Sequence, residues 1–188
     1  MKNRNKKLQI GVVGSCIDLN YSKNAERAAE KLGQSIAKSG NILIFGAEKD
    51  FLSLSQAACR GAKRAEGITV GVTYGKGFNI IEDADIVIPT GLERGGGREF
   101  ILALSCDVII SISGGSGTLN ELTVAYQAGI PIVGLKGFGG WTDKLIEEKY
   151  LDARKRLPII KALSPQKAVE KAISLAKNKK TTHQTTRF

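Results

Sequence analysis

The sequence predicts an α/β fold built on a single doubly wound, all-parallel sheet, Rossmann-like, with helices on both faces. Two observations lead to this prediction. Short apolar segments, rich in β-branched residues, alternate along the chain with segments of helical periodicity, and this alternation is typical of β-α-β units. Several apolar segments also run into glycine, as strands do where the chain turns sharply into a helix. Ligands of such folds bind beyond the carboxyl ends of the strands, so the functional residues are expected there.

The first half of the chain contains three expected strands and two expected helices. The strand at 8–15 is apolar and ends in a glycine turn. The helix at 22–38 ends at Ser39-Gly40 and presents one apolar face at helical spacing, formed by Ala25, Ala28, Ala29, Leu32 and Ile36. The elements that follow are a strand at 42–45, a helix at about 52–65 and a strand at 68–73.

The second half continues the alternation. A short strand at 85–88 precedes a glycine-rich loop at 91–97 and a helix at 98–105. The strand at 108–112 leads into a helix at 118–128, which ends where Gly129 and Pro131 break the pattern. The remaining elements are a strand at 132–135, a helix after the loop 137–141 that reaches about Tyr150, a strand at 158–160, and a last helix that starts at Ser164-Pro165 and frays near Lys177.

Length and composition indicate one globular domain. A chain of 188 residues with 42% hydrophobic and 24% charged residues can bury a substantial core. We expect the folded domain to span residues 8–177, between a basic N-terminal tail at 1–7 and a basic C-terminal tail at 178–188. No apolar run reaches the ~20 residues of a membrane helix, and the first residues are too polar for a secretory signal. A cytoplasmic protein without membrane contact is therefore expected.

The net charge of +10 raises the question of nucleic-acid binding. Its location argues against that role. Residues 1–7 contribute +4, the residues from Lys177 onward contribute another +4, and only +2 remains for the body of the domain. Basic tails on a nearly neutral body are more often solvated ends than a recognition surface. Nucleic acid is therefore not expected as the main partner.

The cysteine and histidine residues limit the chemistry. Cys16, Cys59 and Cys106 lie far apart without metal-ligand spacing, so free thiols in a reducing compartment are expected. Cys16 falls in the first glycine turn, where a packed, inert thiol is favoured over a ligand contact. The only histidine, His183, lies in the C-terminal tail, which leaves no histidine for a catalytic triad or a metal site in the folded body. The sequence predicts no metal site and no resident cofactor.

The segment 107–121 is the most informative part of the chain. It reads Asp-Val-Ile-Ile-Ser-Ile-Ser-Gly-Gly-Ser-Gly-Thr-Leu-Asn-Glu, a buried strand that breaks into glycines and enters a helix at once. Such a junction directs several backbone N–H groups and the positive end of a helix dipole at one point. We therefore expect a phosphate-bearing ligand to bind at Gly14, Ser15, Ser113, Gly114, Gly115, Ser116, Gly117 and Thr118.

The loop is not a standard nucleotide fingerprint, because it lacks the lysine of a Walker loop and the G-x-G-x-x-G spacing. Its extended pattern resembles the Lonely Guy (LOG) family, also known as possible lysine decarboxylases, whose motif is Pro-Gly-Gly-x-Gly-Thr-x-x-Glu. The resemblance spans roughly residues 8–150 and is sharp from 91 to 135. Within the wider Rossmann-like group, the chain is most similar to the uncharacterised branch that is related to DprA and to molybdenum-cofactor carriers. LOG relatives form dimers or larger assemblies, which implies a homo-oligomer here.

The resemblance implies catalytic roles for two charged residues. LOG-type enzymes place their acid–base glutamate at the position of Glu121 and an arginine at the position of Arg98. A guanidinium matches a phosphate or carboxylate bidentately, and an arginine at a helix start opposes the helix dipole. Structural alternatives exist for both residues: Thr118 and Glu121 match a capping box, and Arg98 can form a surface salt bridge with Glu93 or Glu99. Arg94 is a further candidate in the same loop.

The chain departs from the LOG pattern in three places. Ser113 replaces the proline of the motif, and Arg98-Glu99 replaces an Arg-Lys pair. The second glycine signature of LOG enzymes, Gly-Gly-Gly-x-x-Gly-Leu-Met, is absent, and Glu48, Lys49 and Asp50 stand where close backbone approach was expected. These departures argue against hydrolase activity more than they argue against phosphate binding.

Two functions are compatible with these residues. In the first, the protein hydrolyses the N-glycosidic bond of a nucleoside 5′-monophosphate to free base and ribose 5-phosphate. The loop holds the phosphate, Arg98 orients the substrate, and Glu121 activates water. In the alternative, the protein carries a phosphate-bearing ligand, such as molybdenum cofactor, without converting it. A DprA-like accessory role in nucleic-acid processing is a third hypothesis, which only the basic tails support.

Overall fold

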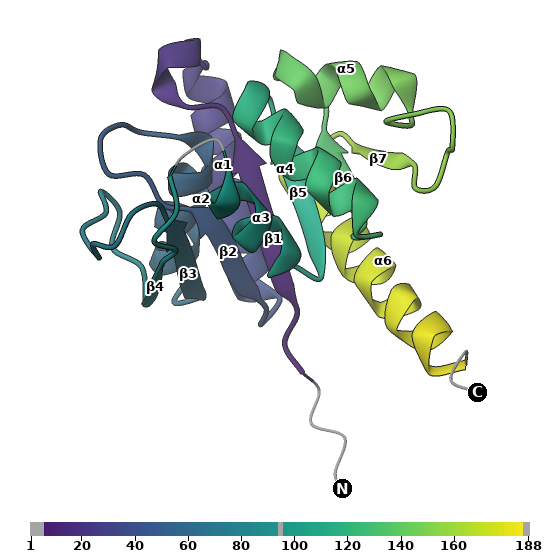
Figure 1. Cartoon of the computed structure of the whole chain (residues 1–188), viewed down its shortest axis with the longest axis horizontal. Helices are drawn as coiled ribbons and strands as arrows, with labels where there is room; N and C mark the ends of the chain where they lie inside the picture. The colour runs from purple at the N-terminus through teal and green to yellow at the C-terminus, as the bar shows by residue number, and fades with distance from the viewer. Residues whose placement is uncertain (1–5, 94–95, 186–188) are drawn as a thin grey trace, which may run out of the picture.

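The computed structural model describes residues 6–93 and 96–185, and the side chains of the last helix up to Asn178. Strands and helices alternate as the sequence predicts (Figure 1). The strands are β1 (Gln9–Gly14), β2 (Ile42–Gly46), β3 (Ile68–Thr73), β4 (Ile86–Pro89), β5 (Val108–Ile112), β6 (Ile132–Leu135) and β7 (Ile159–Ala162). The helices are α1 (Lys23–Lys38), α2 (Leu54–Arg64), α3 (Gly97–Leu104), α4 (Ser116–Gln127), α5 (Gly140–Glu148) and α6 (Pro165–Thr185), with a 3-10 turn, η1 (Ile17–Leu19), after β1.

The seven strands form one sheet in the order β4-β3-β2-β1-β5-β6-β7, and every neighbouring pair is parallel. The predicted doubly wound α/β fold is therefore confirmed. Strands are added in one direction from β1 to β4 and in the other direction from β5 to β7. The topological switch point lies between β1 and β5, and folds of this class bind their ligands at that point.

Helices cover both faces of the sheet and enclose two apolar clusters. α1, α2 and α6 pack on one face, around Leu32, Phe45 and Ile110. α3, α4 and α5 pack on the other, around Leu102, Ile109 and Leu122. β5, which lies next to the central strand β1, is buried along its whole length, which explains its continuous apolar sequence. The sheet thus holds the loops after β1 and β5 in fixed positions at one edge.

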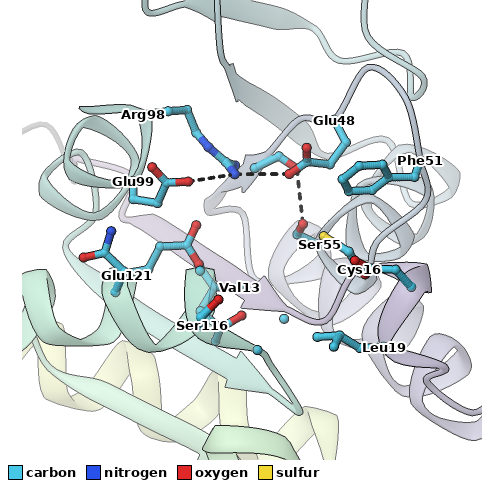
Figure 2. A pocket seen from close by; sticks show the side chains of 17 residues that line it. Val13, Cys16, Leu19, Glu48, Phe51, Ser55, Arg98, Glu99, Ser116 and Glu121 are labelled. Atoms are coloured by element: carbon cyan, nitrogen blue, oxygen red, sulfur yellow. Dashed lines mark hydrogen bonds and ion pairs between the residues drawn. The ribbon is translucent and has the colours of Figure 1, made fainter. Parts of the chain in front are cut away.

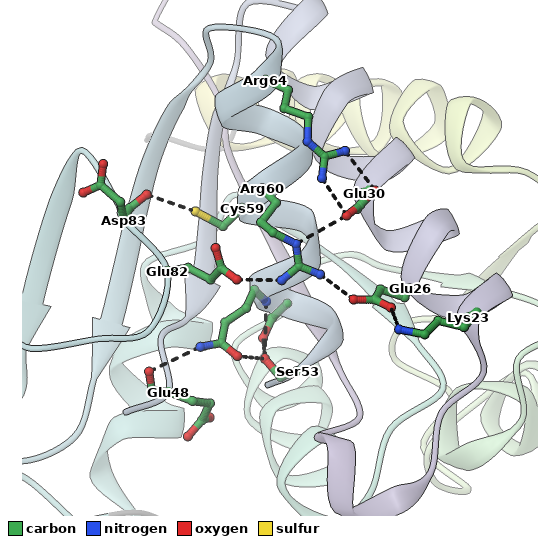
Figure 3. Close-up of polar contacts among 12 residues, drawn as sticks. Lys23, Glu26, Glu30, Glu48, Ser53, Cys59, Arg60, Arg64, Glu82 and Asp83 are labelled. Carbon is green, nitrogen blue, oxygen red and sulfur yellow. Dashed lines mark hydrogen bonds and ion pairs between the residues drawn. The ribbon is translucent and has the colours of Figure 1, made fainter. Parts of the chain in front are cut away.

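α1 and α2 approach each other with their backbones in contact. A Cβ atom at Gly33 would lie 1.8 Å from the carbonyl oxygen of Ala58, and one at Gly61 would lie 1.9 Å from that of Glu30. On the outer side of this pair, the Arg60 guanidinium lies 2.6 Å from carboxylate oxygens of both Glu26 and Glu82 (Figure 3). The contacts fix α2, whose first turn supports one wall of the site described below.

Three elements differ from the sequence prediction. α4 begins at Ser116 rather than near Thr118, because glycine and serine at a helix start carry no strong helix signal. α6 continues to Thr185 rather than fraying near Lys177. The turn η1 was not predicted. Within residues 6–93 and 96–185, none of the helices is long and apolar enough to cross a membrane.

Candidate functional site

A cavity of about 770 Å³ opens at the carboxyl ends of β1, β2 and β5, beside the switch point (Figure 2). We call it the main cavity. Its walls come from the loop after β1, the loop after β2, and the first turns of α3 and α4. The lining residues used below are Gly14, Cys16, Asp18, Leu19, Glu48, Arg98, Glu99, Gly115, Ser116, Gly117, Thr118 and Glu121.

The first turn of α4 forms one end of the main cavity. Gly115 is the N-cap residue and has no side chain to accept a hydrogen bond from the free amides of the first turn. Ser116, Gly117 and Thr118 line the cavity at this point. A Cβ atom at Gly117 would meet no atom within 4 Å, so a ligand can approach its backbone directly. Free amides and a helix dipole at a concave surface suit an anion.

The loop between β5 and α4 has a conformation that proline cannot adopt. Ser113 has φ +56° and Gly114 has φ +104°, whereas the ring of proline fixes φ near −65°. Ser113 occupies the position of the LOG proline, so this substitution changes the path of the loop as well as its stiffness.

α5 holds this loop from outside. The backbone N–H of Trp141 donates to the carbonyl of Gly114 and that of Thr142 to the carbonyl of Ser113, both at 2.9 Å. Gly140 makes this approach possible, because a Cβ atom there would lie 2.6 Å from the oxygen of Gly114. The glycine-rich segment 137–141 therefore serves to dock α5 onto the loop.

Ser15 and Ser113 connect β1 and β5 across the switch point. Ser15 Oγ donates to Ser113 Oγ at 3.0 Å and accepts from the N–H of Gly114 at 2.8 Å. Both side chains are buried. The Gly114 amide is thus already hydrogen-bonded within the protein, and these three residues line a second cavity on the other side of the loop.

The structure therefore divides the ten predicted site residues into two groups. Seven of them line the main cavity: Gly14, Arg98, Gly115, Ser116, Gly117, Thr118 and Glu121. Ser15, Ser113 and Gly114 form the bridge and face the second cavity. Contact of either group with a ligand remains a prediction. Arg94 lies outside the described residues.

Arg98 lies at the end of the main cavity away from Ser116 and is buried among carboxylates (Figure 2). Its Nη2 atom lies 3.2 Å from Glu48 Oε1 and 3.2 Å from Glu99 Oε1. The alternative of a surface salt bridge is wrong for Glu99, because Arg98 and Glu99 are only 6% and 1% exposed. Burial works against the guanidinium charge, but the carboxylates of Glu121 and Glu48 outweigh it and raise the pKa of Arg98.

Glu121 lies inside α4 and faces the same cluster. The capping-box interpretation is wrong, because the helix begins five residues before Glu121 and its N-cap makes no side-chain hydrogen bond. Burial is the main cause that raises the pKa of Glu121 to about 8; Arg98 lowers it, while Glu99 and Glu48 add to the increase. At neutral pH the Glu121 carboxyl is therefore largely protonated in the protein without ligand.

Sequence reasoning missed two of the four acidic residues that line the main cavity, Glu48 and Asp18. Glu48 was noted as a departure from a glycine motif, yet the structure shows that it holds Arg98. The Gln56 amide, which is fully buried, donates to the carbonyl of Glu48 at 3.3 Å and fixes this loop to α2. Cys16 also lines this cavity, although the sequence favours a packed thiol over a ligand contact at this position. Burial and the neighbouring Glu48 and Asp18 raise the pKa of Cys16 to about 12, so it is an unreactive thiol.

The fold and the site define a Rossmann-like protein of the nucleotide- or phosphate-binding kind. The chain belongs to the SLOG cluster4 family, which it matches over residues 7–169. It is 34% identical over 133 residues to an uncharacterized protein from Archaeoglobus fulgidus, covering 70% of this chain and 82% of that one.

Two solved structures are similar over almost their whole length. The molybdenum cofactor carrier protein from Chlamydomonas reinhardtii is 32% identical with a TM-score of 0.77, covering 92% of this chain and 99% of that chain. The molybdenum cofactor binding protein from Rippkaea orientalis is 30% identical with a TM-score of 0.76, covering 91% and 98%. The expected similarity to the branch of this superfamily that contains molybdenum-cofactor carriers is confirmed.

Proposed function

We propose that this protein binds and carries a phosphate-bearing cofactor, such as molybdenum cofactor, without converting it. The observation that carries the proposal is the arrangement of Arg98, which forms ion pairs with Glu48 and Glu99 inside the main cavity. An arginine that two carboxylates already neutralise is a weak attractor for substrate phosphate. The first turn of α4 remains as the anion site.

The two ends of the main cavity suit two ends of one ligand. A phosphate fits at Ser116, Gly117 and Thr118. At the other end, Glu48, Glu99 and Glu121 offer carboxyl oxygens, which accept hydrogen bonds from ring N–H groups, amino groups or hydroxyls. A heterocycle with several N–H groups and a phosphate side chain, as molybdenum cofactor is, meets both requirements. The proposal assigns no metal–sulfur bond to Cys16, since its thiol does not ionise at neutral pH. The two similar proteins whose names refer to molybdenum cofactor support the same ligand class.

A second candidate function is hydrolysis of nucleoside 5′-monophosphates. It is favoured by the buried Glu121 carboxyl, which faces Arg98 as the resemblance to LOG enzymes implies. It is disfavoured by the ion pairs of Arg98 with Glu48 and Glu99 and by the absence of the second glycine signature of LOG enzymes. The raised pKa of Glu121 lowers the ionised fraction of the base at neutral pH without preventing the reaction. The carrier function is therefore the preferred proposal.

Calorimetric titration of the full chain under anaerobic conditions tests the proposal, with purified molybdenum cofactor and AMP as separate probes. In parallel, chromatography checks AMP and other nucleoside monophosphates for released base. We expect binding of molybdenum cofactor and no base release. Gly117→Ala should weaken binding by at least ~10-fold, because the new methyl group lies between the ligand and the first-turn amides.

A matched control distinguishes the loss of the anion site from the general effect of a substitution at a helix start. Gln166→Ala changes an exposed residue at the equivalent second position of α6 and should leave binding unchanged. Gly117→Ala should also keep or slightly raise thermal stability, by up to about 1 kcal/mol, because alanine favours a helix. Release of base by the wild type, or full affinity in Gly117→Ala, would contradict the carrier proposal at this site.

A further inference from the structure

A second cavity of about 500 Å³ lies on the other side of the loop that follows β5. Its walls come from the loop after β1, the loop after β5 and the segment between β6 and α5. Leu19 and Gly115 line both cavities, so the two spaces adjoin at these residues. The Ser15–Ser113 hydrogen bond lies between the strand ends beneath them.

The chemistry of the second cavity differs from that of the main cavity. Three aromatic side chains line it, Tyr21, Phe138 and Trp141, together with the hydroxyls of Ser15, Ser22 and Ser113. Among the described residues that line the second cavity, Lys144 carries a charge and none has a carboxylate side chain. The main cavity, in contrast, contains four acidic residues and Arg98. The second cavity therefore suits a ring that stacks on aromatic side chains next to an anionic group, whereas the acidic end of the main cavity suits a ring that donates hydrogen bonds to carboxyl groups.

The backbone of Trp141 is hydrogen-bonded to the loop after β5. Its backbone N–H donates to the carbonyl of Gly114, so a change in the loop is transmitted directly to this residue. The ammonium of Lys144 lies 4.7 Å from the centroid of the indole ring. Lys144 is exposed, so a flexible side chain, rather than packed core, covers this face of the indole. A flat ring can replace the ammonium on the indole, and the displaced ammonium can then pair with a phosphate.

We propose that the second cavity is a subsite for a nucleobase or a similar flat heterocycle, and that the protein accepts a two-headed ligand of the dinucleotide class. One head occupies the main cavity, and the second head lies against Trp141. The linking phosphates cross between the cavities at Leu19 and Gly115. A Cβ atom at Gly115 would lie 2.6 Å from Leu19 Cδ1, so the Leu19 side chain must move aside for them. The proposal rests on the proposed function, because the phosphates must bind at the first turn of α4. Beyond the proposed function, it implies that the protein selects ligands that are long enough to span both cavities and that carry a second flat ring.

The intrinsic fluorescence of the protein tests this proposal directly. Trp141 is the only tryptophan in the chain, and a nucleobase stacked on an indole quenches its emission. The probes are AMP, diadenosine pyrophosphate and diguanosine pyrophosphate, each titrated into the full chain with both fluorescence and calorimetric detection. We expect a dinucleotide to quench Trp141 and to bind ~10-fold more tightly than AMP.

Variants separate the two subsites. Trp141→Leu should lower the affinity for the dinucleotide ~10-fold and leave the affinity for AMP unchanged. Trp141→Phe should keep most of the affinity for the dinucleotide. Lys144→Gln should weaken the dinucleotide less, ~3-fold. Phe78→Leu replaces an aromatic residue that is 67% exposed and lines neither cavity; it is the matched control and should change nothing. If Trp141→Leu does not fold, the quenching of the wild type and the Lys144→Gln titration still decide.

Each outcome distinguishes this inference from the proposed function. Suppose that AMP and both dinucleotides bind with equal affinity, that Gly117→Ala abolishes this binding, and that none of the three changes the Trp141 emission. This result would overturn the second subsite and leave the main site intact. Quenching that persists unchanged in Gly117→Ala would overturn the two-headed ligand, because the ring would then bind independently of the phosphate site. Absence of binding for all three probes would overturn the second subsite for nucleotides, while the titration with molybdenum cofactor still tests the main cavity.

Discussion

Arg98 Nη2 lies 3.2 Å from Oε1 of Glu48, a residue 50 positions earlier in the chain. This ion pair joins the start of α3 to the loop after β2 inside the main cavity. Glu48 stands in the segment that replaces the second glycine signature of LOG enzymes. Where the glycine signature would let a ligand approach the backbone closely, this chain has a carboxylate that pairs with Arg98. The proposal of a carrier function rests on this ion pair.

Gly46→Ala should displace Arg98 while keeping its charge in the protein. A Cβ atom at Gly46 would lie 2.3 Å from Arg98 Nη1, so the guanidinium must shift and its ion pairs with Glu48 and Glu99 must weaken. Because Arg98 lowers the pKa of Glu121, its displacement should raise that pKa further. NMR titration of side-chain-labelled glutamate measures the shift. Arg98→Gln serves as the positive control, and an unchanged Glu121 titration in Gly46→Ala would show that the guanidinium stays in place.

Glu121→Gln should stabilise the protein, and more so at higher pH. Burial raises the pKa of Glu121 from 4.5 to about 8. Below pH 4.5 the carboxyl is neutral in both the folded and the unfolded chain. Between these values only the unfolded chain ionises, so the wild type loses stability as the pH rises, until the penalty is complete above about pH 8. Glutamine cannot ionise, so the variant should be more stable by roughly 1–3 kcal/mol at pH 8.

Denaturant unfolding from pH 4 to 9 measures this difference. Glu148→Gln, an exposed position on α5, is the matched control and should follow the wild-type curve. The capping interpretation gives the opposite sign, a loss of stability at neutral pH. A destabilised Glu121→Gln variant would therefore contradict the position of Glu121 inside α4.

The pH dependence of base release separates the two candidate functions. If the protein hydrolyses nucleoside monophosphates with Glu121 as the base, turnover requires the ionised carboxyl. The rate should therefore rise with pH through about 8, where the Glu121 carboxyl ionises, and level off above it. Glu121→Gln should abolish the reaction at every pH. A carrier releases no base at any pH, and a rate that falls as the pH rises through this range would exclude Glu121 as the base.

The sequence predicted the strand–helix alternation and the glycine-rich junction between β5 and α4 because both depend on local patterns. The apolar run 108–112 and the glycines after it determine their own structure. The carboxylates around Arg98 could be predicted only in part. Glu99 is the neighbour of Arg98 in the sequence, whereas Glu48 and Glu121 come from other segments, and only the order of strands in the sheet brings these two to Arg98. The second cavity is likewise a product of packing, since α5 reaches the loop through Gly140.

The contrast between Gly140 and Gly137 gives the last prediction. Both have positive φ, +66° and +103°, so alanine is strained at either position. A Cβ atom at Gly140 would also lie 2.6 Å from the oxygen of Gly114, whereas one at Gly137 would meet no atom within 4 Å. Gly137→Ala should therefore cost only the strain, about 1 kcal/mol. Gly140→Ala should cost more, roughly 2–4 kcal/mol, because α5 must move off the loop and lose two hydrogen bonds.

Thermal unfolding and Trp141 emission together measure these effects. Gly140→Ala should lower the melting temperature more than Gly137→Ala and shift the emission of Trp141 towards longer wavelength as its ring becomes more exposed. Gly137→Ala should leave the emission unchanged. If the two variants lose equal stability and Trp141 emits as in the wild type in both, then α5 does not hold the loop through Gly140. In that case the loop after β5 keeps its path by the Ser15–Ser113 bridge alone, and Ser15→Ala should then be the more damaging substitution.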